Sequence, residues 1–243
     1  MILNNNKIIF NNKREIISNY EKLNISKKGI HSNIYKYNDT EILKIFKRKA
    51  TSEQIEVMNI ISTYERDLFS KPILLIEIKN NIVGYTMKFL QGSSLDLVSG
   101  NAKIKNIFDF FDEKIDKQMI KLSNDKLEIW DLNYNNLLYD EENSLFHFID
   151  TDCYKLKKSK SSEEIYLSNS LEIISVLLHF LLYKGVFYTT FFEFSKKLLE
   201  NGINIKKILY TIKDYLENVY DKKIIDLNNL SIAEEILIKK YIK

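Results

Sequence analysis

Three oxygen-bearing side chains are spaced along the chain in a way that suits a hard divalent cation and a hydroxyl nucleophile. Asp131 and Asn136 lie in one polar stretch, and Asp150 ends the second of two apolar runs, residues 136–139 and 145–149, that predict a hairpin. The hairpin would bring Asn136 and Asp150 to the same edge. Carboxylate and amide oxygens suit Mg²⁺ when phosphates supply its remaining ligands. We therefore expect Asn136 and Asp150 to bind Mg²⁺, and Asp131 to orient an attacking hydroxyl.

A lysine inside an apolar strand provides the cation that phosphate chemistry also requires. Lys44 is flanked by isoleucine, leucine and phenylalanine, where an isolated lysine is more often a surface residue of an edge strand. Its surroundings favour a role in binding. Upstream, the polar turn of residues 29–35 contains Gly29 and Ser32 and could cover phosphates. Downstream, a predicted helix carries two glutamates, either of which could pair with the lysine.

This set of residues resembles the catalytic parts of protein kinases, of an atypical bacterial type, and of the related aminoglycoside and choline kinases. The loop from Ile129 to Asn136 is similar to the family's His-Arg-Asp-x4-Asn sequence, and Asp150-Thr-Asp is similar to its Asp-Phe-Gly motif. The resemblance covers about residues 20–185. It implies that Asp131 and Lys44 are catalytic, that Glu56 (with Glu53 as the second candidate) pairs with the lysine, and that ATP contacts these residues: Lys44, Glu56, Gly29, Ser32, Met87 and Phe89.

The sequence departs from the family pattern at several of these positions. Ile129 stands where the family has histidine, and Trp130 where protein kinases have arginine. Asn133 replaces a lysine used near the γ-phosphate, and Asp152 replaces glycine, as in several small-molecule kinases. No arginine follows Arg66, so we expect no control by a phosphorylated activation loop, which usually needs that arginine.

These features leave three functions open. The favoured one is ATP- and Mg²⁺-dependent transfer of the γ-phosphate to a hydroxyl of a protein serine or threonine. A small-molecule kinase is favoured by Asp152 and by the short lysine-rich segment 153–167, which lacks an Ala-Pro-Glu anchor. An ATP-binding pseudokinase scaffold is favoured by Ile129, Trp130 and Asn133.

The elements that must position these residues change in type along the chain. Strand patterns dominate the first part, with a hairpin around Asn11-Asn12. One helix, residues 51–64, interrupts them. The predicted strands are 7–10, 14–17, 20–25, 33–37, 41–46, 73–78 and 82–89.

Helical periodicity dominates after residue 100. Asn169, with Glu172 three residues later, resembles the capping box of the second of these helices. The predicted helices are 104–122, 169–184, 188–201, 204–220 and 231–242. The sequence therefore predicts an α+β, bilobal protein-kinase-like fold: a β-rich N-terminal lobe with one helix, residues 1–91, and a mostly helical C-terminal lobe with the catalytic loop, residues 92–243.

Composition narrows the range of partners. The chain has 243 residues, 45% of them hydrophobic, which supports a sizeable core. Its formal net charge of +3 makes nucleic acid an unlikely partner. The longest apolar stretch, residues 173–183, is shorter than the roughly 20 residues that span a bilayer, so we interpret it as a buried helix and expect no membrane partner. A single cysteine, Cys153, and the lack of a signal peptide predict a cytoplasmic protein.

Overall fold

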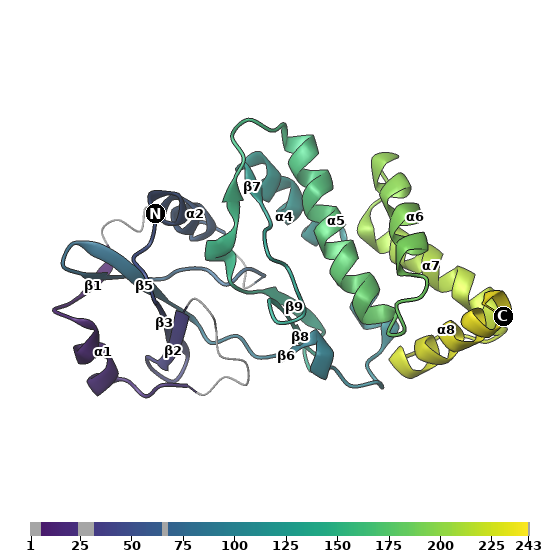
Figure 1. The fold of residues 1–243 in the computed structure, drawn as a ribbon, viewed down its shortest axis with the longest axis horizontal. Coiled ribbons are helices and arrows are strands. Elements are labelled where there is room, and N and C mark those ends of the chain that lie inside the picture. Colours follow the sequence, from purple (N-terminus) through teal and green to yellow (C-terminus); the bar gives the residue numbers. More distant parts are fainter. Residues whose placement is uncertain (1–5, 24–31, 65–67, 243) are drawn as a thin grey trace. The chain divides into compact units, whose positions relative to one another are not determined.

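The computed structural model describes residues 6–23, 32–64 and 68–242 (Figure 1). The chain forms two compact units, which are described separately. The first unit consists of Met1–Gln91 and His147–Lys155, and the second of Gly92–Phe146 and Leu156–Lys243. The segment that carries Asp150 thus belongs to the first unit, although it lies far along the chain. Gly29 lies outside the described residues.

The first unit is built on a five-stranded sheet with the strand order β1-β4-β5-β3-β2. The edge strand β1 runs parallel to β4, and the other neighbours are antiparallel. The strands are β1 (Lys7–Phe10), β2 (Ser32–Lys36), β3 (Glu41–Phe46), β4 (Leu75–Ile78) and β5 (Asn81–Lys88).

A helix replaces one strand that the sequence predicts. Residues 14–17 belong to α1 (Lys13–Asn19), not to a hairpin with β1. The side chain of Asn12 accepts a hydrogen bond from the N–H of Glu15, which caps the helix. Ile16 is buried, whereas Ile17 is 61% exposed. Of the apolar pair, only Ile16 therefore lies on the buried helix face, and Asn12, which suggested a turn, caps the helix instead.

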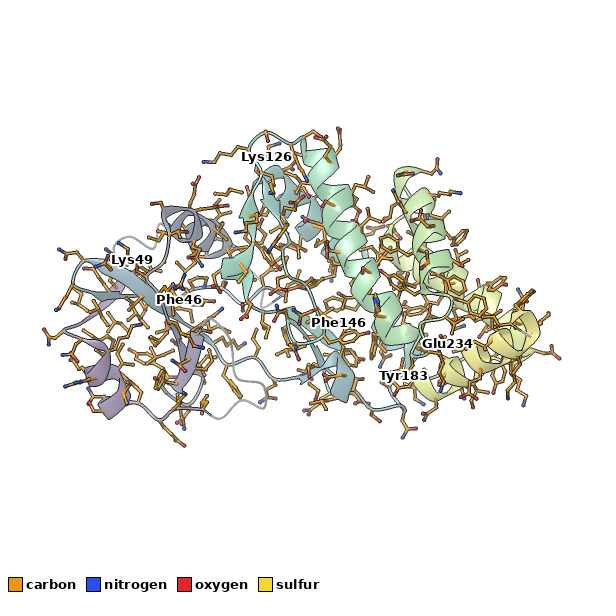
Figure 2. All side chains as sticks on the ribbon, viewed as in Figure 1. Phe46, Lys49, Lys126, Phe146, Tyr183 and Glu234 are labelled. Atoms are coloured by element: carbon orange, nitrogen blue, oxygen red, sulfur yellow. The ribbon has the colours of Figure 1, made fainter. Side chains whose placement is uncertain are left out.

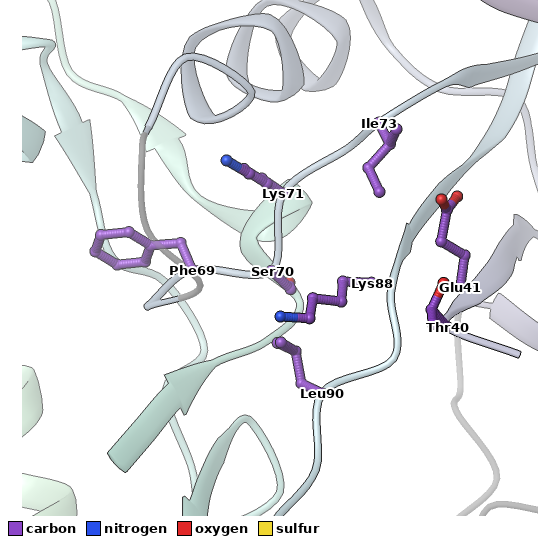
Figure 3. A pocket seen from close by; sticks show the side chains of 8 residues that line it. All are labelled: Thr40, Glu41, Phe69, Ser70, Lys71, Ile73, Lys88 and Leu90. Carbon is purple, nitrogen blue, oxygen red and sulfur yellow. The ribbon is translucent and has the colours of Figure 1, made fainter. Parts of the chain in front are cut away.

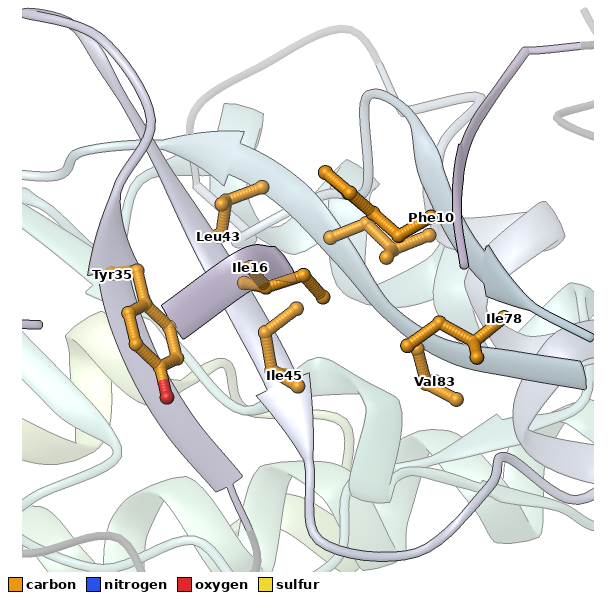
Figure 4. Packing of buried hydrophobic residues seen from close by; sticks show 8 residues of the cluster. Phe10, Ile16, Tyr35, Leu43, Ile45, Ile78 and Val83 are labelled. Atoms are coloured by element: carbon orange, nitrogen blue, oxygen red, sulfur yellow. The ribbon is translucent and has the colours of Figure 1, made fainter. Parts of the chain in front are cut away.

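The two faces of the sheet carry separate apolar clusters. Leu43 and Ile45 of β3 lie on one face with Ile16 of α1 and Val83 of β5 (Figure 4). The intervening residues of β3 lie on the other face, as strand alternation requires. That second cluster contains Met58 of α2 (Ser52–Ile61), together with Ile42, Phe46, Tyr85 and Met87. Because of this division, β3 directs Lys44 toward the α2 face.

The second unit is mostly helical. Its helices are α3 (Ile104–Asp109), α4 (Glu113–Asn124), α5 (Ser162–Leu181), α6 (Tyr188–Glu200), α7 (Ile205–Tyr220) and α8 (Leu227–Tyr241). The predicted helix 104–122 is two helices, because the Asp112 side chain accepts hydrogen bonds from two N–H groups and starts α4. The capping box of α5 is formed by Ser161 and Glu164, so Asn169 lies inside that helix rather than at its start.

Short strands connect these helices. A three-stranded sheet has the order β6-β8-β9, which confirms the predicted hairpin, and a two-stranded sheet joins β7 to β10. Phe146 of β9 is labelled in Figure 2. Its ring centroid lies 4.7 Å from that of Tyr139 and 5.0 Å from that of Phe110. The strands are β6 (Ser93–Ser94), β7 (Leu127–Glu128), β8 (Leu137–Asp140), β9 (Leu145–Phe148) and β10 (Lys155–Leu156).

The helix α5 is long and apolar enough to cross a membrane by length and composition alone, and half of its apolar window is buried. A core helix of a globular domain passes the same test. α5 contacts α4, α6 and α8, and it buries Asn169 and Ser170 among its apolar residues. These contacts fit a core helix, the interpretation that the sequence also favours.

Two buried carboxylates hold the C-terminal helices. Glu217 of α7 accepts hydrogen bonds from the N–H of Ile224 and from two lysines. Burial raises its pKa, but the bond from Lys213 and the other donors outweigh burial and lower the pKa to about 2. Glu234 of α8 accepts a bond from the N–H of Lys184, and burial raises its pKa (Figure 2).

Candidate functional site

Lys44 is a buried lysine in the middle of β3. Lys44 is 3% exposed, and it lies opposite Tyr85 in the pairing of β3 with β5. The two strands come close at Gly84, where a Cβ would clash with the carbonyl oxygen of Lys44. The ammonium lies 5.6 Å from the centre of the Tyr85 ring and 6.0 Å from that of Phe46. The sheet thus directs a cation into a largely apolar environment, where it needs partners of opposite charge.

Two carboxylates supply those partners. Lys44 Nζ donates to Asp150 Oδ1 at 2.9 Å and also to Asp152 Oδ1. The hydroxyl of Tyr85 donates to the same oxygen of Asp152 at 2.8 Å. The Asp152 side chain is 4% exposed, whereas that of Asp150 is 44% exposed. The site therefore has a closed inner pair, Lys44 with Asp152, and an outer carboxylate, Asp150, that solvent reaches.

Burial and charge have opposite effects on the lysine. Burial lowers the pKa of Lys44, but Asp152, Tyr85 and Asp150 outweigh it and hold that pKa well above its usual value. Burial, followed by the charge of Asp152, raises the pKa of Tyr85 well above its usual value. At neutral pH the lysine is therefore charged and the tyrosine is a neutral donor, as their contacts require.

The segment that carries the two aspartates is tied to residues 68–70. Asp150 has a left-handed backbone conformation (φ 59°) and precedes the 3-10 turn η3 (Thr151–Cys153). Thr151 Oγ1 donates to the carbonyl oxygen of Ser70 at 2.6 Å, and the N–H of Ser70 donates to Phe148 at 2.8 Å. Non-glycine residues with positive φ tend to cluster at functional sites. The strained backbone at Asp150 is consistent with a carboxylate held in one orientation.

Asp131 occupies the same strained conformation in the second unit, also with a φ of 59°. Its carbonyl oxygen accepts hydrogen bonds from Asn136 Nδ2 at 2.8 Å and from Asn133 Nδ2 at 3.0 Å. The N–H of Asn136 donates to the carbonyl oxygen of Asn133 at 3.0 Å. The side-chain nitrogen of Asn136, Nδ2, is thus used within the loop, and the side-chain oxygen, Oδ1, is the atom suited to a cation. Asp131 itself is exposed.

A residue that sequence reasoning missed braces the start of this loop. Asn169 of α5 is fully buried; its Oδ1 accepts from the N–H of Ile129 at 2.7 Å, and its Nδ2 donates to the carbonyl of Leu127 at 3.0 Å. The sequence suggested a cap at Asn169, and the only signal for this different role was an amide within an apolar run. Asn169 therefore fixes the backbone of Leu127 and Ile129 just before the loop.

The remaining predicted nucleotide-binding residues lie in varied surroundings of the first unit. Glu56 is exposed on α2. Ser32 is half-buried at the start of β2. Met87 is a core residue of β5, and Phe89, just after that strand, is half-exposed with its N–H donating to Thr40 at 2.8 Å.

A cavity of about 240 Å³ also lies in the first unit, but none of the predicted site residues that the structure describes lines it (Figure 3). Its lining residues include Ser70 and Ile73 from one stretch of the chain and Lys88 and Leu90 from another (Figure 3). Ser70 Oγ is buried there without a hydrogen-bond partner among the described residues. The cavity is therefore distinct from the Lys44 cluster. The two are linked indirectly, because the carbonyl oxygen of Ser70 accepts a hydrogen bond from Thr151, which follows Asp150.

Comparisons with known proteins support the fold alone. No family model matches the sequence, and no curated protein does. Among solved structures, the chain is similar to Rad53 1–466 in complex with AMP-PNP, with a TM-score of 0.52 and 12% sequence identity. The similarity covers 68% of this chain and 48% of that one, so the chain matches about half of the other protein's length. It supports a protein-kinase-like fold of mixed α and β structure.

Proposed function

We propose that the chain is an ATP- and Mg²⁺-dependent phosphotransferase, and that its two units act as the two lobes of a kinase. The observation that carries the proposal is the buried Lys44 ammonium, held in its charged form beside the half-exposed carboxylate of Asp150. A charged lysine suits the phosphates of a nucleotide, and the neighbouring carboxylate suits their metal ion. The similar solved structure, Rad53, holds the nucleotide AMP-PNP, which supports the same ligand class here.

Each proposed role follows from the chemistry of one side chain. Lys44 binds phosphate oxygens, and Asp152 together with Tyr85 keeps the lysine extended and charged. Asp131 orients the acceptor hydroxyl and takes its proton as the oxygen attacks the γ-phosphorus. The bond from the γ-phosphorus to the bridging oxygen of ADP then breaks, and ADP leaves with the electron pair. Asn133 and Asn136 hold the backbone of Asp131 during this step.

The oxygen donors of the chain fit Mg²⁺ shared with a nucleotide rather than a closed protein site. Among the described residues, no group of three or more histidine, cysteine, aspartate or glutamate side chains gathers as a metal site would. Asp150 offers a half-exposed carboxylate, and Asn136 an amide oxygen. Mg²⁺ prefers few protein oxygens, with phosphates and water completing its shell. When bound, it would neutralise charge on the phosphates.

We propose a protein serine or threonine as the acceptor. The link between β10 and α5 spans only residues 157–161, which is little room for a peptide-docking platform and keeps a small-molecule hydroxyl as the second candidate. A pseudokinase scaffold is the outcome if ATP binds without transfer. We also propose a cytoplasmic location, on the basis of the sequence alone.

The test measures ATP binding and phosphate transfer separately. Wild-type protein is incubated with Mg²⁺ and labelled ATP, alone, with generic protein acceptors and with small hydroxyl compounds. Asp131→Asn should keep ATP binding and lose transfer by about 10²–10⁴-fold, the range for removing a general base. Lys44→Met and Asp150→Asn should weaken ATP binding itself, and Asn136→Ala should raise the Mg²⁺ concentration required.

Asp221→Asn is the matched control for both aspartate variants. Asp221 is exposed and has the same left-handed backbone (φ 56°), so the substitution tests the effect of aspartate to asparagine at positive φ away from the site. It should leave binding and transfer unchanged. Absence of ATP binding by the wild type would refute the proposed function, and binding without transfer to any acceptor would refute the enzymatic part.

A further inference from the structure

A buried acid stands at the start of the loop that carries Asp131. Glu128, in β7, is 5% exposed. Its Oε1 accepts a hydrogen bond from Lys160 Nζ, and its Oε2 lies 3.7 Å from Lys157 Nζ. Both lysines belong to residues 156–161, termed the 156–161 segment, which joins the Asp150 region to α5. One acid thus connects the catalytic loop to the segment that follows the predicted metal motif.

Backbone contacts align the same two parts of the chain. The N–H of Lys157 donates to the carbonyl oxygen of Lys126 at 2.9 Å. In return, Lys126 Nζ donates to the carbonyl of Lys160 at 3.1 Å and to Ser162 Oγ at 3.2 Å. On the other side of β7, Asn169 holds the backbone groups of the two residues that flank Glu128. Glu128 is therefore fixed in place and can act as an anchor.

The charges make this anchor stronger than a surface ion pair. Burial raises the pKa of Glu128, but the hydrogen bonds from Lys160 and Ser168, followed by the charges of Lys160 and Lys157, outweigh it and lower the pKa. The acid is therefore ionised at neutral pH. A buried carboxylate without a cation is costly, so moving the two lysines away would be opposed by that cost. Lys157 also lies 5.8 Å from the centre of the exposed Trp130 ring, beside Asp131.

We infer that Glu128 is a positioning residue that keeps the 156–161 segment ordered against the catalytic loop through Lys157 and Lys160. The inference rests on the proposed function. Because the anchor is an acid, it recruits cations and would repel a phosphate group on the segment. Ordering of the segment therefore requires no phosphorylation, and neutralisation of the two lysines releases it.

Hydrogen exchange of the full chain tests the anchor without reference to activity. Peptides covering the 156–161 segment report the Lys157 amide, which is hydrogen-bonded to Lys126. Glu128→Gln and Lys160→Gln should each speed its exchange by about tenfold or more, as expected on losing a hydrogen bond to a buried charge. The double variant should exchange no faster than Glu128→Gln alone. Glu142→Gln, the same change at an exposed turn position, should have no effect.

Unchanged exchange in both single variants overturns the inference. If Glu128→Gln loosens the whole second unit, Lys160→Gln decides, because that lysine side chain is 41% exposed and its loss leaves the core intact. Local acceleration in Lys160→Gln supports the anchor, and its absence refutes it.

Kinetics then separate positioning from binding. In Glu128→Gln, kcat should fall by about tenfold or more while KM for ATP stays unchanged, because misplacement of the loop affects transfer rather than nucleotide contacts. Glu128→Asp, which keeps the charge, should recover part of the rate. Equal kcat in the wild type and Glu128→Gln, despite faster exchange, overturns the positioning role. A wild type without ATP binding refutes the proposed function, but it does not affect the exchange test.

Discussion

Replacing Lys44 with methionine should destabilise the first unit by far more than the lost packing, because Asp152 would stay buried without a cation. The side chains of both residues are 4% exposed. Breaking a buried ion pair from one side costs about 3–5 kcal/mol. Tyr85 would still donate to Asp152, which places the expected loss near the lower end, about 3 kcal/mol.

The structure also predicts how this loss is shared between the two aspartates. In Lys44→Met/Asp152→Asn, the neutral amide oxygen can still accept from Tyr85, so much of the stability should return. We expect a coupling energy of about 2 kcal/mol for Lys44 with Asp152. For Lys44 with Asp150 it should be under about 1 kcal/mol, because the Asp150 carboxylate is 44% exposed and screened by water.

Urea unfolding of the wild type, the single variants and the two double variants gives both coupling energies. Far-UV circular dichroism follows the whole chain. The fluorescence of Trp130, the only tryptophan, follows the second unit, which is needed because two units do not always unfold together. A coupling to Asp150 equal to or larger than that to Asp152 would refute the inner and outer assignment of the two carboxylates.

Three further predictions concern the second unit. Asn169→Ala would leave two buried backbone groups without their partner, at about 1–3 kcal/mol each, so the urea midpoint read by Trp130 fluorescence should fall; an unchanged midpoint would disprove the brace. The pKa of Glu217 is lowered from 4.5 to about 2, so its carboxylate stabilises the fold above pH 4.5, and this stabilisation is lost as the pH falls toward 2. Glu217→Gln should therefore make stability less dependent on pH within that window. An acid-unfolding profile identical to that of the wild type would contradict this. Glu234 has a pKa raised by burial, so its stabilisation is present below the ordinary value and is lost as the pH rises through the raised value; Glu234→Gln should remove that loss in melting temperatures measured from acid to neutral pH.

Local sequence patterns predicted one hairpin but not two of the helix boundaries. The hairpin of β8 and β9 was predicted from two apolar runs around a polar turn, and it is present. The same kind of reasoning was wrong at residues 14–17, since an asparagine can start a helix as well as form a turn. It was also wrong at residues 104–122, where an apolar stripe continues across a helix boundary that the Asp112 cap creates.

The sequence by itself singled out Lys44, Asp131, Asn136 and Asp150 as candidate groups, by residue type and spacing. Tertiary structure decided their partners. It placed Asp150 and Asp152 at the Lys44 ammonium, because residues 147–155 return to the first unit. It also brought Asn169, whose sequence context suggested a helix cap, to the start of the loop that carries Asp131. Such contacts join residues far apart in the chain, and no local periodicity or spacing encodes them.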